Sequence, residues 1–261
     1  MNPFKLGWMH LRISALNELQ YRANFFLAAF NALLALATGL IVIALVYSHT
    51  ESLNGWSEPE LLIVMGIHVF IGGIIRAFVE PNMHQLMQDI EEGTLDYTLT
   101  RPADAQLLVS VRATSIWQTV DLAIGLIVVA VGVVQLQAAT SVAHVAAFLV
   151  TILLGAVIIY CVWLMITTSA FKLINVGNMV QMLQGIYQAG RWPVSIYPLW
   201  LRGGLTFIVP LAFAITVPAE ALADRLAGTT IAAAIAFTFV VALVTRLVWR
   251  WGLSSYSGAS A

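Results

Sequence analysis

Long stretches without charged residues dominate the chain. A helix that crosses roughly 30 Å of hydrocarbon needs about 20 largely apolar residues. Three stretches without Asp, Glu, Lys or Arg reach that length: Ala23 to Thr50, Leu122 to Phe171 and Leu226 to Thr245. The second is long enough for two crossings, folded at the polar patch Gln135 to Ser141. The shorter run Leu61 to Ile75 is predicted to continue past Arg76, whose long stem can carry its guanidinium to the headgroups.

The composition agrees with this pattern. Of the 261 residues, 60% are hydrophobic and 10% are charged, whereas soluble domains carry about 25% charged residues. The mean hydropathy is +0.89. These values exclude an ordinary soluble domain and predict an all-α integral membrane protein in contact with the lipid bilayer, with no nucleic-acid partner.

The basic residues predict the orientation of the chain. If the N-terminus is cytoplasmic and the first four crossings alternate, nine of the twelve Lys and Arg residues lie on the cytoplasmic side: Lys5, Arg12, Arg22, Arg76, Arg101, Arg112, Lys172, Arg246 and Arg250. The outward loop, Ser48 to Glu60, contains three Glu residues and no Lys or Arg. Because cytoplasmic loops carry the excess of basic residues, we expect a multi-pass protein of the cell (inner) membrane with both termini in the cytoplasm.

The fifth crossing has two candidates. If it is Gly203 to Pro218, only one of the twelve basic residues lies outside, whereas three do if it is Leu173 to Gly190. The charge count therefore favours the first candidate. The second carries five amides at spacings of three, three, three and four: Asn175, Asn178, Gln181, Gln184 and Gln188. Those spacings place them on one helical stripe.

Amides are costly in hydrocarbon unless they are paired. The stripe is therefore expected either to line a water-accessible pathway within the protein or to lie on an amphipathic helix at the cytoplasmic surface. We keep both alternatives for Leu173 to Gly190.

Two segments outside the bilayer are predicted to be helical. Pro3 to Leu19 mixes apolar and basic residues, as expected of an interfacial helix on the inner leaflet. Asn82 to Glu92 places Met83, Leu86, Met87 and Ile90 on one face and is expected to end at Gly93. Its acidic tip, Glu91 and Glu92, is either a docking point for a basic groove or a solvated turn.

Few ionisable groups lie at membrane depth, namely Asp121, His68 and Arg76, with Arg246 near the end of the last crossing. This set is too sparse for a metal site. A buried Asp121 should be paired, with Arg76 or Arg246 as candidates, or take part in substrate binding or conformational coupling. His68 is expected to be hydrogen-bonded to a neighbour or to relay protons.

Three stretches, in order, resemble the permease subunits of type-2 ABC exporters, and together they cover essentially the whole chain. The segment after the acidic helix carries residues similar to the pattern that follows that family's coupling helix: Gly93, Leu95, Asp96, Leu99, Arg101 and Pro102. Arg191 to Leu222, with four prolines, resembles the family's segment between spans 5 and 6. The tail Trp251 to Ala261 (WGLSSYSGASA) is similar to the end of one six-span branch.

The resemblance implies one transmembrane domain over residues 1–261, with an interfacial helix at 3–19, a coupling helix at 82–92 and a re-entrant helical segment at 199–220. Its six spans would lie at about 23–47, 59–79, 113–135, 144–170, 173–190 and 228–249. Two permeases, identical or related, would form a pathway at their interface. The substrate is left open.

The resemblance also implies roles for particular residues. Contact with the ATPase would come from Met87, Ile90, Glu91, Glu92, Gly93, Leu95, Asp96 and Arg101, and the pathway would be lined by the five amides. The only lysines, Lys5 and Lys172, do not follow the glycine pattern of a phosphate-binding loop. ATP and Mg²⁺ would therefore be bound by a separate ABC ATPase, and this chain would hold no catalytic residue, cofactor or metal.

Two other functions remain as alternatives. An ion-coupled secondary transporter would use Asp121 and His68. A membrane-embedded enzyme is disfavoured, because its chemistry usually needs clustered carboxylates or a nucleophile with its base.

Overall fold

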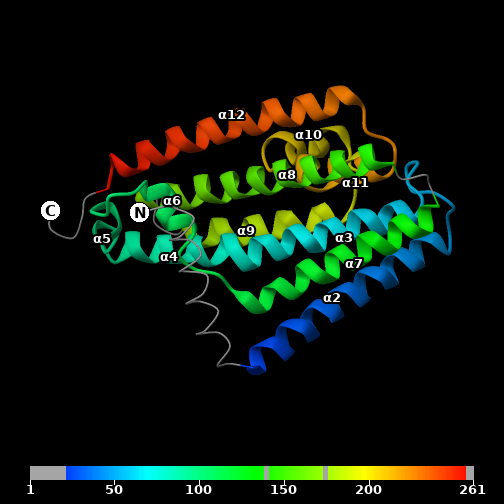
Figure 1. The fold of residues 1–261 in the computed structure, drawn as a ribbon, viewed down its shortest axis with the longest axis horizontal. Helices are drawn as coiled ribbons and strands as arrows, with labels where there is room; N and C mark the ends of the chain where they lie inside the picture. The colour runs from blue at the N-terminus through cyan, green and yellow to red at the C-terminus, as the bar shows by residue number, and fades with distance from the viewer. Residues whose placement is uncertain (1–21, 138–140, 173–175, 257–261) are drawn as a thin grey trace.

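The structure is a computed structural model that describes residues 22–137, 141–172 and 176–256 (Figure 1). These residues form an all-α fold, and the described ranges contain no β-strand beyond one isolated bridge between Leu53 and Trp56. The all-α membrane architecture expected from the sequence is confirmed. The expected interfacial helix at 3–19 lies outside the described residues.

Within the described residues, five helical segments are long and apolar enough to cross a membrane. They are α2 (Arg22–Tyr47), α3 (Glu58–Ile74) with its continuation, α7 (Val120–Leu136), α8 (Val142–Thr168) and α12 (Gly228–Leu253). The continuation of α3 passes through the π-helical turn η1 (Ile75–Val79) into α4 (Glu80–Glu91). These five segments lie at the positions of five predicted crossings.

Polar residues at the ends of the apolar runs fix where helices begin. At the start of α3 the backbone N–H of Ser57 donates to Glu60 Oε2 over 2.7 Å, which forms a capping box. Ser141 and His144 form the corresponding box before α8. Each box satisfies N–H groups that a helix start leaves unpaired.

Helix α3 lies at the centre of the bundle and packs closely against α7. A Cβ atom on Gly66 would lie 2.7 Å from the backbone nitrogen of Val129. A Cβ atom on Gly125 would lie 2.6 Å from the nitrogen of Phe70. The two backbones therefore meet where both helices carry glycine, as small residues allow in membrane helix pairs.

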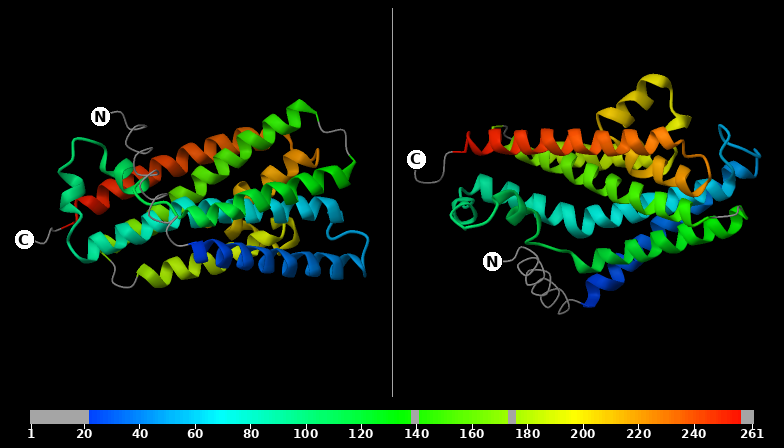
Figure 2. Two further views of the ribbon diagram at one scale, coloured as in Figure 1. Left: turned by 60° about the horizontal axis from the view of Figure 1, so that its bottom comes forward. Right: turned by 45° about the horizontal axis from the view of Figure 1, so that its top comes forward.

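The chain between α8 and α12 is divided into short helices. It contains α9 (Val176–Tyr187), the 3-10 turns η4 (Gln188–Arg191) and η5 (Val194–Ile196), α10 (Leu199–Phe207), the π-helical turn η6 (Ala212–Thr216) and α11 (Val217–Leu222). The pair formed by 199–207 and 212–222 is bent by 77° around Pro210. Helix α10 projects from the bundle, in gold in the right-hand view of Figure 2, and exposes Leu199, Trp200 and Phe207.

The direction of the chain bears on the fifth crossing. Helix α8 ends near α4, whereas α12 begins at the opposite end of the bundle (Figure 1). The chain between them must therefore travel the length of the bundle, and α9 runs in that direction beside α3 and α8. Helix α9 has 12 residues, about 18 Å. The bent pair is either a broken span or a re-entrant loop by its geometry.

Candidate functional site

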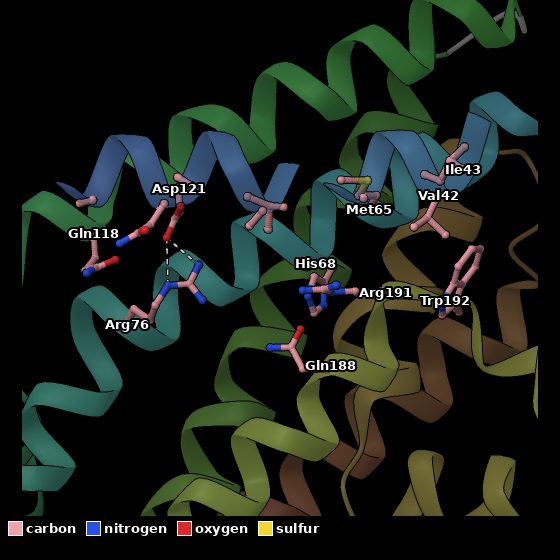
Figure 3. Close-up of a pocket in the computed structure, with 16 residues that line it drawn as sticks. Val42, Ile43, Met65, His68, Arg76, Gln118, Asp121, Gln188, Arg191 and Trp192 are labelled. Carbon is pink, nitrogen blue, oxygen red and sulfur yellow. Dashed lines mark hydrogen bonds and ion pairs between the residues drawn. The ribbon is translucent and has the colours of Figure 1, made fainter. Parts of the chain in front are cut away.

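A cavity of about 560 Å³ lies between α2, α3, the start of α7 and η4 (Figure 3). This volume is within the range of small-molecule sites. Its lining residues come from all four segments: Ala28, Asn31, Ala32, Ala35, Gly39, Val42, Ile43, Met65, His68, Val69, Arg76, Gln118, Asp121, Gln188, Arg191 and Trp192. Segments far apart in the sequence thus share one internal space.

One wall of the cavity is a stripe of small residues on α2. Ala28, Ala32, Ala35 and Gly39 follow one another at spacings of four, three and four, which places them on one face of the helix. A Cβ atom on Gly39 would lie 2.3 Å from Met65 Cε. The stripe therefore lets α2 lie close to α3 and leaves room beside it.

The Arg76–Asp121 ion pair forms the polar end of the cavity. Arg76 donates from Nε and Nη2 to Asp121 Oδ2 over 2.9 and 2.6 Å. The Asp121 side chain is buried, while that of Arg76 is 41% exposed. The sequence predicted Arg76 or Arg246 as the partner of Asp121. The structure pairs Asp121 with Arg76, and Arg246 instead binds Asp104.

His68 lies on α3, before Arg76 in the chain, and is buried, with 7% of its surface exposed. Its ring stacks on Tyr187 with centroids 4.5 Å apart, and the Tyr187 hydroxyl donates to the His68 carbonyl oxygen. Its Nδ1 atom is buried and has no hydrogen-bond partner among the described residues. No hydrogen bond joins His68 to Asp121 in that part of the chain, so a direct proton relay between them is not formed.

The amide stripe is divided by its surroundings. Asn175 lies outside the described residues, and the side chain of Asn178 is likewise not described. Gln181 is exposed, whereas Gln184 donates to Glu80 Oε1 over 2.6 Å. Gln188 lines the large cavity.

A second cavity joins the amides to the charged pair. It has a volume of about 280 Å³ and lies between η1, α8 and α9. Gln184, Gln188 and Arg76 are among its lining residues. Two of the five predicted pathway residues, Gln184 and Gln188, therefore line the same cavity as Arg76, which was predicted as an intramembrane charge. The two amides lie one helix turn apart.

At the α4 end of the bundle the chain makes a compact turn. We call residues 92–104 the α4–α6 turn; it contains α5 (Asp96–Leu99) and leads into α6 (Ala105–Ser110). Gly93 has a φ of +70° directly after α4, and Thr94 N–H donates to Asp89 O over 2.9 Å. Glycine favours this left-handed conformation, and it ends α4 where the sequence predicted a helix end.

The predicted ATPase contacts differ in exposure. Glu91, Glu92 and Arg101 are exposed at the turn. Ile90, Gly93 and Asp96 are half-buried. Met87 and Leu95, by contrast, are buried in this chain's own core. In the described conformation these two side chains hold the turn together and are not available to another protein.

Asn82 on α4 fastens that helix to residues 112 and 113, which lie between α6 and α7. Its amide nitrogen donates to the carbonyl oxygens of Phe78 and Ala113, each over 2.7 Å. Its carbonyl oxygen accepts from the backbone N–H groups of Arg112 and Ala113, each over 2.9 Å. Asn82 is 1% exposed, so this buried amide is fully paired.

Ion pairs fasten α4 and the turn at two further points. Arg112 forms an ion pair with Asp89 on α4, and Arg246 on α12 forms one with Asp104. The hydrogen bond from Arg246 lowers the pKa of Asp104. The turn is therefore linked to α4 and α12, and α4 is linked to Arg112 in the segment that leads into α7.

Sequence reasoning missed several of these residues. Arg191 and Trp192 follow the amide stripe directly, and a search beyond the stripe would have included them in the pathway. Nothing in the sequence marks Asn82 or Asp89 as a link to residues 112 and 113. Within the described ranges, no group of three or more His, Cys, Asp or Glu side chains lies together where it could hold a metal ion.

Comparison with known proteins adds the family. The sequence model of the ABC-2 family transporter protein matches residues 33–260. A search of the curated proteins and a search of the solved structures find no match. The matched range includes most of the lining of the large cavity, the second cavity, the α4–α6 turn and all of the helices described above except the first part of α2. The chain therefore belongs to the ABC-2 transporter family and is the membrane-embedded permease of an ABC transporter.

Proposed function

We propose that this permease is one half of an ATP-driven exporter whose ATPase is a separate chain that docks on the α4–α6 turn. The observation that carries the proposal is the construction of that turn. It lies at one end of the bundle, where Glu91, Glu92 and Arg101 are exposed. Asn82 and Asp89 fasten the adjoining helix α4 to residues 112 and 113, and Asp104 fastens the turn to α12. A force applied at the turn would reach α12 directly, and through α4 it would reach the segment that leads into α7.

The ATPase partner would bind ATP and Mg²⁺, because this sequence contains no phosphate-binding loop. The permease would lie in the cell (inner) membrane, with the turn and both termini in the cytoplasm. That orientation follows the positive-inside rule. Arg101 lies in the turn and Arg112 shortly after it, whereas the loop between α2 and α3 carries Glu residues and no Lys or Arg.

A second permease, identical or related, would complete the pathway. Helix α2 is the least buried of the candidate spans, and its small-residue stripe forms one wall of the large cavity. Gln188 lines the same cavity, and Gln184 and Gln188 both line the second cavity. A partner seated against α2 would enclose a pathway between the two chains.

The docking proposal is tested by charge reversal at the turn. Glu91→Lys combined with Glu92→Lys should release the ATPase when the permease is purified from its native membrane. Glu51→Lys is the matched control, because Glu51 is also exposed but lies at the opposite end of the bundle. Full retention of the ATPase by the double variant would contradict docking at this acidic tip.

The second candidate function is an ion-coupled secondary transporter. It is favoured by one observation: His68 and Asp121 line the same cavity. Transport that is lost in Asp121→Asn and persists after ATP depletion would support it over the exporter.

A further inference from the structure

The large cavity carries an excess of positive charge. Its lining contains two guanidinium groups, Arg76 and Arg191, and one carboxylate, Asp121. Asp121 is already bound by Arg76. Among the described residues, Arg191 forms no ion pair, whereas Arg112, Arg225 and Arg246 each bind a carboxylate. One cation at the cavity is therefore left without a counter-ion.

The unpaired cation lies beside another unsatisfied group. Arg191 belongs to η4 and lines the cavity together with His68 (Figure 3). That ring is buried and its Nδ1 atom has no partner in the described part of the chain. Figure 3 shows both residues at the cavity, with Gln188 and Trp192 from the same segment. Because buried polar groups are normally paired, the unpartnered Nδ1 atom of His68, at the same cavity as the exposed guanidinium group of Arg191, indicates a missing ligand.

The opposite wall is largely apolar, with Asn31 as its one polar lining residue. It consists of the small-residue stripe of α2, continued by Val42 and Ile43, with Met65 and Val69 from α3. Trp192 adds an aromatic surface. An apolar body would fit along this wall, while a polar group at one end would face Arg191.

We propose that the cavity binds an anionic amphiphile, a molecule with one acidic group facing Arg191 and an apolar body along the α2 stripe. A carboxylate or phosphate oxygen forms charge-assisted hydrogen bonds with guanidinium groups, and these are stronger than neutral ones. A cationic amphiphile of the same shape would instead be repelled by the excess positive charge of Arg191. The cavity therefore selects by the sign of the charge.

The inference rests on the proposed function only in treating this ligand as the transported substrate. Binding itself requires no ATPase, because both the cation and the apolar wall belong to this chain. Measurements of binding and of ATPase retention thus separate the two proposals. A permease that retains its ATPase and shows no charge preference would overturn this inference alone.

The test uses the full-length permease in nanodiscs of zwitterionic lipid. The probe is 11-(dansylamino)undecanoic acid, an anionic amphiphile whose fluorescence can be excited by energy transfer from tryptophan such as Trp192. Decanoate, decanol and decyltrimethylammonium then compete for the site. We expect decanoate to displace the probe at a concentration about tenfold lower than the cation does. Equal competition by all three, or tighter binding of the cation, would overturn the proposal.

Variants locate the binding charge. Arg191→Gln should weaken probe binding about tenfold, which is the loss expected for one charge-assisted interaction, and Arg191→Lys should restore most of it. Arg202→Gln is the matched control, because Arg202 is exposed on neighbouring α10 and does not line the cavity. Unchanged binding in Arg191→Gln contradicts the assignment. If that variant does not fold, the competition series on the unmodified chain still decides the charge preference.

The same chemistry could come from the membrane or from the aqueous phase. Nanodiscs that contain phosphatidylglycerol separate these sources. Loss of probe binding in them identifies an anionic lipid as the occupant, and retained binding identifies a less membrane-bound acid. Both results support an anionic ligand, provided that zwitterionic lipid leaves the probe bound.

Discussion

Arg246 and Asp104, 142 positions apart in the sequence, form an ion pair that joins the last spanning helix to the α4–α6 turn. Arg246 also donates to Gln106 Oε1 over 2.8 Å. The side chains of the pair are 46% and 44% exposed, so its contribution to the free energy of unfolding should be below about 1 kcal/mol. The main effect of this ion pair is on geometry, because it holds the turn against α12.

The first prediction concerns the pH dependence of this link. The Arg246 hydrogen bond lowers the pKa of Asp104 in the folded protein. A carboxyl group with a lowered pKa stabilises the folded state above its unfolded pKa, about 3.9, and loses that contribution as pH falls through the folded pKa. The protection of the α6 amides against hydrogen exchange, taken relative to the intrinsic exchange rate at each pH, should therefore fall on acidification below about pH 4.

Asp104→Asn should remove this acid-dependent step and leave α6 exchanging faster at neutral pH. Arg246→Gln serves as the matched variant, because it removes the same pair from the other side. An equal acid response in the unmodified chain and in both variants would mean that other carboxylates control exchange in α6.

The second prediction concerns Asn82. Replacement by Leu removes four hydrogen bonds and leaves the backbone groups of Arg112 and Ala113 without partners. The loss should be about 2 to 4 kcal/mol, since each unsatisfied buried group costs about 1 to 3 kcal/mol. Hydrogen exchange at the N–H groups of Arg112 and Ala113 measures this locally. Asn82→Asp keeps the acceptor oxygen and should protect both N–H groups better than Asn82→Leu.

The third prediction concerns the contact of α3 with α7. Gly125→Ala places a methyl group 2.6 Å from the nitrogen and 2.7 Å from the Cβ atom of Phe70, so the helices must separate. Such overpacking costs about 1 to 3 kcal/mol. Gly204→Ala is the control, because an added Cβ atom there meets nothing within 4 Å. Thermal unfolding should distinguish the two variants, and equal midpoints would contradict the close packing.

Much of this fold was predictable from the pattern of charges. The five long helices coincide with runs of apolar residues, because hydrocarbon excludes charged side chains wherever the helix faces lipid. The end of α4 was also predictable, since Gly93 has no Cβ atom to oppose a φ of +70°. Both features depend on local sequence alone.

The cavity was not predictable by the same reasoning. It forms where the α2 stripe, three positions on α3, the start of α7 and the residues after α9 meet, and only tertiary packing brings these segments together. The amide stripe was a partial guide. Its regular spacing assumes one continuous α-helix, but α9 ends at Tyr187 and η4 begins at Gln188, so the stripe does not continue to Arg191.

The fourth prediction concerns the buried ion pair at the cavity. Asp121→Ala leaves Arg76 without its carboxylate, and the free energy of unfolding should fall by about 1 to 3 kcal/mol, below the value for a fully buried pair because Arg76 is 41% exposed. Arg76→Leu combined with Asp121→Leu removes both charges and should destabilise less than Asp121→Ala alone. Unfolding in a detergent series measures both. Suppose that the stability lost by the double variant equals the sum of the losses measured for Arg76→Leu alone and Asp121→Leu alone. The two residues are then not coupled.

The last prediction decides the fifth crossing. If α9 crosses the membrane and the bent pair re-enters from the far side, Arg191 lies at the outer end of the pathway. Arg191→Cys, in a chain whose buried Cys161 is replaced by Ala, should then react with a membrane-impermeant thiol reagent added outside intact cells. Glu51→Cys should react from the same side, and Arg101→Cys only in inverted vesicles. Labelling of Arg191→Cys in inverted vesicles alone would instead make α10 and α11 the fifth crossing. It would also place α9 on the cytoplasmic side of the membrane, as the charge count by itself favours.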